Sequence, residues 1–264
     1  MTATLARDLA AERLDWLVPQ WNGPARVAAL FTTRSGGGSA GAAATMDVGP
    51  AHPTARELEG AIGANRRRLA AFLPTAPIWL SQVHGIDVVD IDARSAAALR
   101  VQPPQADAAI VRAPRIAVAV RTADCLPVLF ADRAGSVLGV AHAGWRGLAA
   151  GVLEATVAAM NVPAHDIVGW IGPAIGPHAF EVGADVHRMY CGNDAGAAAH
   201  FSPLRDGKWL ADLPALARRR LAASGITDVA GGHWCTHADA ERFFSYRRDK
   251  ASGRMALVAW LADP

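Results

Sequence analysis

Residues 116–160 read IAVAVRTADCLPVLFADRAGSVLGVAHAGWRGLAAGVLEATVAAM, and their apolar runs indicate the fold class. Short apolar segments at 116–120, 126–130 and 137–141 are separated by polar or turn residues, a pattern that predicts three strands. The apolar run from 148 to 160 is long enough to predict a helix. Strands followed by a helix in this way indicate a sheet with helices packed against it.

Sequence patterns on either side of this stretch predict further strands and helices. Thr54 and Glu57 have the spacing of a capping box, which predicts a helix that starts there and continues to about Phe72. The helices do not alternate strictly with the strands, so we expect a single α+β domain over residues 1–264. Its mixed or antiparallel sheets would be covered by helices in an α/β/β/α-like layering. The other expected elements are strands at 27–33, 78–83, 86–91, 108–111, 167–171 and 255–261, and helices at 184–190 and 213–223.

Composition excludes several classes of protein. The 264 residues include 26 basic and 24 acidic side chains, and a net charge of +2 leaves no excess for a nucleic-acid backbone. Three cysteines without a Cys-x-x-Cys pair predict neither a disulfide framework nor a cysteine-rich zinc module. Charged residues interrupt every apolar run before it could span a membrane or act as a signal peptide. We therefore expect a cytoplasmic protein without membrane or nucleic-acid partners.

Three short motifs place a candidate metal ligand at the expected end of a strand. These ligands are His84 in SQVHG, Cys125 in TADC and His142 in AHAGWRG. Two imidazoles and a thiolate would form a tetrahedral zinc site with one open position, as catalytic zinc requires. The alternative is that both histidines only cap strands and that the cysteine is an ordinary buried residue.

Two further motifs admit either a binding or a structural interpretation. Residues 144–147, Gly-Trp-Arg-Gly, precede the predicted helix, so Arg146 and backbone amides there could bind an anion or simply form the turn. Residues 243–249, FFSYRRD, could stack on a base and hold an oxyanion, or could form a sheet edge.

Taken together, these and other motifs resemble the YfiH-type proteins, which are also called laccase-domain proteins, polyphenol oxidases and purine nucleoside phosphorylases. The motifs span about residues 27 to 262. Asp47 departs from the family pattern, which usually has Asn at that position. The resemblance rests on FTTRSGG (31–37), NR (65–66), QVHG (82–85), TADCLPV (122–128), HAGWRG (142–147), IGP (171–173), EVG (181–183) and FFSYRRD (243–249).

The resemblance implies a function and a set of site residues. His84, Cys125 and His142 would be zinc ligands. The implied activities are phosphate-dependent cleavage of adenosine, inosine and methylthioadenosine, and hydrolytic deamination of adenosine. A small-molecule nucleoside and phosphate would be the partners. Arg34, Arg66, Gln82 and Arg146 are the candidates for binding substrate or phosphate.

Asp124, next to the cysteine ligand, has two candidate roles. It could act as a general base, or it could orient a histidine ligand.

Three other functions remain open at this point. Copper could occupy the same three ligands in a polyphenol oxidase, although a multicopper enzyme needs on the order of ten histidines and this chain has nine without a His-x-His pair. A metal-free thiol hydrolase could use Cys125 as nucleophile and His142 as base. A binding module could use the metal for structure alone.

Overall fold

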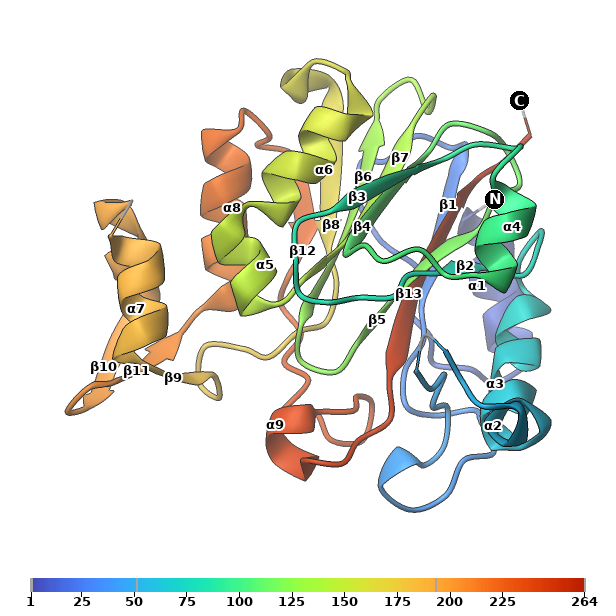
Figure 1. Cartoon of the computed structure of the whole chain (residues 1–264), viewed down its shortest axis with the longest axis horizontal. Coiled ribbons are helices and arrows are strands. Elements are labelled where there is room, and N and C mark those ends of the chain that lie inside the picture. Colours follow the sequence, from blue (N-terminus) through green and yellow to red (C-terminus); the bar gives the residue numbers. More distant parts are fainter. Residues whose placement is uncertain (1, 51, 193, 264) are drawn as a thin grey trace.

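The computed structural model describes residues 2–50, 52–192 and 194–263, and two β-sheets form its centre (Figure 1). Both sheets are mixed, with parallel pairs only at their edges, β2 with β5, β3 with β4, and β12 with β8. The four-stranded sheet has the order β1 (Val27–Phe31), β13 (Met255–Leu261), β5 (Val118–Thr122), β2 (Ile78–Trp79). The six-stranded sheet has the order β12 (Val229–Gly231), β8 (Ile167–Ile171), β6 (Leu126–Asp132), β7 (Leu138–Ala143), β4 (Ala108–Val111), β3 (Val88–Ile91).

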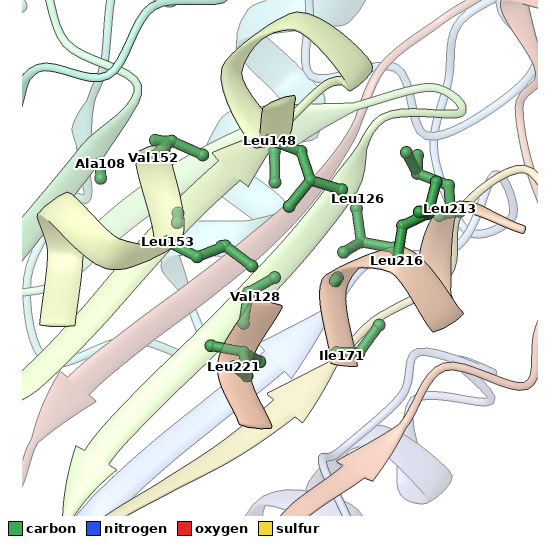
Figure 2. Packing of buried hydrophobic residues seen from close by; sticks show 14 of the residues in the cluster. Ala108, Leu126, Val128, Leu148, Val152, Leu153, Ile171, Leu213, Leu216 and Leu221 are labelled. Carbon is green, nitrogen blue, oxygen red and sulfur yellow. The ribbon is translucent and has the colours of Figure 1, made fainter. Parts of the chain in front are cut away.

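Helices cover the outer face of each sheet. Helices α5 (Trp145–Ala150), α6 (Val152–Met160) and α8 (Leu213–Ala223) pack on the six-stranded sheet, and Figure 2 shows their leucines beside Leu126 and Val128 of β6. On the other side, α1 (Thr2–Ala11) and α3 (Ala61–Ala70) pack on the four-stranded sheet.

A third apolar cluster fills the space between the two sheets. The order is therefore helix, sheet, sheet, helix, which confirms the α+β class and the α/β/β/α-like layering.

A smaller unit lies beside the six-stranded sheet. Strands β9 (Glu181–Gly183), β10 (Phe201–Arg205) and β11 (Lys208–Ala211) form an antiparallel sheet that packs with α7 (Ala184–Cys191), at the left of Figure 1. The remaining helices are α2 (Ala55–Glu59), α4 (Ala96–Val101) and α9 (Tyr246–Asp249), with 3-10 turns η1 (Gly41–Ala43), η2 (Ala164–Asp166) and η3 (Ala195–His200). No helix in the described part of the chain combines the length and apolar character that crossing a bilayer demands.

Several expected elements differ from the observed ones. The capping box at Thr54 is present, but Gly60 ends α2, and a separate helix, α3, follows. The helix expected over 148–160 begins at Trp145 and breaks at Gly151, whose φ of 107° only glycine adopts readily. The sheet edge considered for 243–249 is wrong, because the segment enters the core through Phe243 and Phe244 and then forms α9.

Candidate metal centre and active site

His84, Cys125 and His142 come together at one end of the two packed sheets. His84 lies in the connection from β2 in one sheet to β3 in the other, and Cys125 lies in the connection from β5 to β6. His142 is in β7, where it pairs with Pro127 of β6, only two residues from Cys125. The chain therefore crosses between the sheets twice at this end, and both crossings carry a ligand beside His142.

The spacing of the three side chains suits a metal ion. Their ligand atoms all lie within 4.8 Å of one another, and Cys125 Sγ is 3.7 Å from His84 Nε2. Tetrahedral zinc would place a thiolate sulfur and an imidazole nitrogen about 3.6 Å apart, given ordinary bond lengths. The residues therefore fit a three-ligand site with one position left for substrate or water. Among the residues that the structure describes, this is the only such group of three or more His, Cys, Asp or Glu side chains.

Asp107, which sequence reasoning missed, holds both histidines in place. Its fully buried carboxylate accepts a hydrogen bond from His142 Nδ1 at 2.8 Å, so Nε2 is the nitrogen left for a metal. It also accepts the backbone N–H groups of Val83, His84 and Gly85 at 2.7 to 3.0 Å. Burial alone would raise the pKa of Asp107, but these hydrogen bonds hold the pKa below its ordinary value.

The backbone around the ligands is tightly constrained. His84 and Asp124 have φ values of 61° and 87°, a region that costs non-glycine residues free energy and that clusters at functional sites. Gly144, just after β7, passes so close to the ligands that a Cβ there would lie 2.8 Å from His84 Cδ2 and 3.1 Å from Cys125 Sγ. Only glycine lets the turn into α5 approach the site this closely.

Charge around Cys125 favours its thiolate. Burial would raise the pKa of the thiol, but the charge of His142 and hydrogen bonds from His142 and His84 lower it to about 6. Burial would likewise lower the pKa of His142, but the Cys125 thiolate and the Asp107 carboxylate raise it to about 9. Thiolate is the form that binds metal and the form that acts as a nucleophile.

Asp124 is held by partners outside the metal cluster. Its Oδ1 accepts the hydroxyl of Thr236 at 2.6 Å, and its Oδ2 accepts the backbone N–H of Arg247 at 2.7 Å. Asp107, and not Asp124, therefore orients the histidine ligand.

Two cavities meet at the candidate ligands. The first, of about 260 Å³, is largely apolar, and the second, of about 410 Å³, is more polar. His84, Ala123, Cys125 and Tyr246 line both. The first is completed by Asp124, Trp145, Arg146, Ile175, Phe180, Leu213 and Arg247. The second is completed by Gln82, Arg121, Thr122, His142 and Arg254.

The four candidate binding residues are spread over different places. Arg146 lines the apolar cavity with its guanidinium over the Trp145 ring. Gln82 lines the polar cavity, but its amide bonds the backbone N–H and C=O of Arg121. Arg34 and Arg66 line neither cavity.

The guanidinium groups of Arg34 and Arg66 bind backbone carbonyls. Arg34 donates to Ala44 and Ala240, and Arg66 donates to Val48 and Pro50. In each case these bonds hold loops together.

Comparison with known proteins identifies several similar chains. A family described as multi-copper polyphenol oxidoreductase laccase matches residues 28–262. The purine nucleoside phosphorylase PA4543 of Pseudomonas aeruginosa is 48% identical over 94% of this chain and 99% of its own length. The purine nucleoside phosphorylase YfiH of Escherichia coli is 47% identical over 93% of this chain and 98% of its own. The crystal structure of a Neisseria meningitidis protein, 44% identical, superposes with a TM-score of 0.86 over 94% of this chain and all of that one.

Proposed function

The chain belongs to the family described as multi-copper polyphenol oxidoreductase laccase, and because similar relatives are named purine nucleoside phosphorylases, we propose that it cleaves purine nucleosides with phosphate. Membership confirms the resemblance to YfiH-type proteins. In the proposed reaction the glycosidic C–N bond breaks and a phosphate oxygen bonds to the anomeric carbon. The base keeps the electron pair and takes up a proton. Adenosine, inosine and methylthioadenosine are the proposed substrates, with deamination of adenosine as a second activity.

The observation that best supports the proposal is the apolar cavity beside the three candidate ligands. The side chains of Trp145, Phe180 and Tyr246 supply aromatic surface, and Ile175 and Leu213 supply aliphatic surface. A purine ring is flat and aromatic, so it buries well against such walls. A nucleoside bound in this cavity would lie directly beside His84 and Cys125, which also line it.

Two charged residues would orient the base in this cavity. Each carboxylate oxygen of Asp124 accepts one hydrogen bond from the chain and keeps a lone pair for a purine N–H. Arg146 is exposed at the cavity wall and can donate to a ring nitrogen or a carbonyl oxygen. We therefore assign Asp124 and Arg146 to substrate binding.

Zinc is the metal we propose for His84, Cys125 and His142. A mixed set of imidazole and thiolate donors suits zinc, and a zinc ion with an open position supplies Lewis-acid chemistry and can lower the pKa of water to about 7. A multicopper oxidase needs several copper sites, whereas the described residues bring together a single three-ligand cluster. Asp107 keeps His142 ready to bind by accepting the proton on Nδ1.

Product analysis tests the proposed reaction. Purified protein is incubated with inosine, adenosine or methylthioadenosine, with and without phosphate, and the products are identified. We expect free base and sugar 1-phosphate only when phosphate is present, and inosine from adenosine in either buffer. Cys125→Ala and His142→Ala should lose activity and metal together. Cleavage that is independent of phosphate, or no cleavage of any nucleoside, would contradict the proposal.

Metal analysis separates zinc from copper. Protein from cells grown without added metal should contain one zinc per chain and have no visible absorption. Stoichiometric copper with an intense blue band would instead support an oxidase.

A thiol hydrolase is the second candidate, because Cys125, His142 and Asp107 form a nucleophile, a base and an orienting carboxylate. The lowered pKa of Cys125 suits that role. Iodoacetamide treatment of the metal-loaded protein decides between the two. If Cys125 is a ligand, inactivation releases a stoichiometric amount of metal, and bound zinc slows it. Inactivation without metal release would favour the hydrolase.

A further inference from the structure

The polar cavity on the other side of the candidate ligands carries an excess of positive charge. Arg121 and Arg254 line it, and within the described part of the chain no Asp or Glu does. Burial and then repulsion from Arg66 and Arg254 lower the pKa of Arg121 to about 10, and only Asp47 opposes this effect. A buried guanidinium still holds its charge at neutral pH, so the cavity favours an anion.

Two buried polar atoms, in residues that line this cavity, have no hydrogen-bond partner among residues 2–50, 52–192 and 194–263. They are Thr122 Oγ1 and Arg121 Nε. Thr122 is only 1% exposed, and buried polar groups in folded proteins nearly always have a partner. Both atoms belong to the last two residues of β5, which ends at this cavity. A bound oxyanion could supply the missing partner if a small rotation of either side chain turned the donor toward the cavity.

The end of β5 is fixed in place by its neighbours. The Gln82 amide donates to the Arg121 carbonyl at 2.8 Å and accepts the Arg121 N–H at 2.9 Å. The Arg121 guanidinium donates to the carbonyls of Gly49 and Leu80 at 3.3 and 3.2 Å. These bonds hold Arg121 and Thr122 at the cavity wall before any ligand arrives, and such preorganisation favours binding.

Arg254, the residue just before β13, also lines this cavity. Its backbone N–H is held by the Asp47 carboxylate at 2.7 Å, and its Nη1 binds Ser252 and Gly253. Its Nε and Nη2 make no hydrogen bond to the described residues, which leaves an edge of the guanidinium to bind a ligand. The side of a guanidinium that presents two N–H groups matches two oxygens of a phosphate.

We propose that this polar cavity is an oxyanion site that holds inorganic phosphate between Arg121, Thr122 and Arg254. The proposal rests on the proposed function for its biological role, since phosphorolysis requires an anion beside the nucleoside. The purine then lies in the apolar cavity and the phosphate in the polar one. The two ligands would meet beside the residues that line both cavities, His84, Ala123, Cys125 and Tyr246.

Titration with inorganic phosphate tests the site directly on the metal-loaded protein. We expect Arg254→Gln to raise the dissociation constant for phosphate at least tenfold and Thr122→Val to raise it several-fold. Arg133→Gln, which removes the same charge from the half-exposed Arg133–Asp228 ion pair, should leave it unchanged. Thr122→Val has an additional signature, because it removes an unpaired buried hydroxyl. The melting temperature without phosphate should stay the same or rise, while the increase caused by phosphate should shrink.

Enzyme kinetics separate this proposal from the proposed function. With inosine as substrate, Arg254→Gln should raise the KM for phosphate and leave the KM for inosine within about twofold. If phosphate binding weakens in both variants but the wild type cleaves no nucleoside, the result supports the oxyanion site and contradicts the proposed function. If inosine is cleaved and neither variant changes phosphate binding or its KM, the oxyanion site is wrong. Absence of phosphate binding to the wild type also overturns it.

Discussion

Among single residues, Asp107 stands out because it connects both candidate histidine ligands. One carboxylate binds His142 Nδ1 and three consecutive backbone N–H groups that include the N–H of His84. The sequence offers little signal for this role, because Asp107 is a single acidic residue before an apolar strand. Its full burial is what identifies it. A buried charge of this kind is retained only where several donors satisfy it.

Replacing Asp107 should weaken metal binding. Asp107→Asn keeps the size of the side chain but removes its charge and one acceptor, so the loop of His84 and the imidazole of His142 lose their fixed orientation. Loss of such a partner typically lowers metal affinity about 10- to 100-fold. Competition for zinc with a coloured chelator measures the change, and Asp90→Asn on the exposed edge of β3 is the matched control. Equal affinities in the two variants would show that Asp107 does not support the ligands.

Gly144 provides the second test at this scale. In Gly144→Ala the new Cβ would lie 2.8 Å from the His84 ring and 3.1 Å from Cys125 Sγ, closer than folded structures tolerate, so the arrangement of these side chains must change. We expect a lower zinc content, while far-UV circular dichroism stays unchanged. Gly38→Ala is the control, because a Cβ there meets nothing within 4 Å. Full zinc occupancy in Gly144→Ala would argue that the ligands do not need this close approach.

At the scale of elements, glycine determines where helices end. Apolar periodicity continues across Gly60 and Gly151, so each helix pair looks continuous in the sequence. At Gly151 the backbone turns into the left-handed region, which α-helix periodicity does not reveal. The small sheet of β9 to β11 was missed because its strands are three to five residues long and β10 is almost entirely exposed.

Helix α9 and the loop before it are held by Arg248. Its guanidinium donates to the carbonyls of Thr236, His237 and Phe243, and it pairs with the Asp249 carboxylate at 2.8 Å. Thr236 in turn binds Asp124 in the apolar cavity. Through Thr236, Arg248 therefore helps to hold Asp124 in the apolar cavity.

The Arg248–Asp249 pair should make stability depend on pH. The hydrogen bond from Arg248 lowers the pKa of Asp249 below its ordinary value. Because the folded-state pKa is the lower one, the contribution is complete above the unfolded pKa of about 3.9 and is lost as the pH falls through the folded value. Asp249→Asn should therefore be less stable than wild type at pH 7, with the difference shrinking below pH 4. Urea unfolding at both pH values measures this, and a difference that does not depend on pH would exclude the pair as its cause.

In the molecule as a whole, the candidate metal site lies at the end of the sheets and outside the apolar cores. The two outer clusters join helices to sheets, and the middle one joins the sheets to each other. None of the three needs a metal to form, and a chain of this length buries enough surface to fold by itself.

Removing the metal should therefore leave the protein folded. A chelator is expected to lower the melting temperature, because a ligand that binds only the folded state stabilises it, while far-UV circular dichroism at 25 °C stays the same. Zinc added back should restore the original melting temperature. Global unfolding on chelation would instead show that the metal is structural.

Most of the apolar strands, several helices and the three motifs that carry His84, Cys125 and His142 could be predicted from the sequence. Local periodicity predicts which face of a strand is buried, and short motifs can be recognised in the sequence without knowledge of the fold. The packing of the two sheets is what brings together candidate ligands 41 and 17 residues apart, with Asp107 and the end of β5 at Arg121 and Thr122 beside them. These contacts could not be predicted from the sequence, because they form where two sheets pack and the chain crosses between them, and no local pattern encodes that crossing.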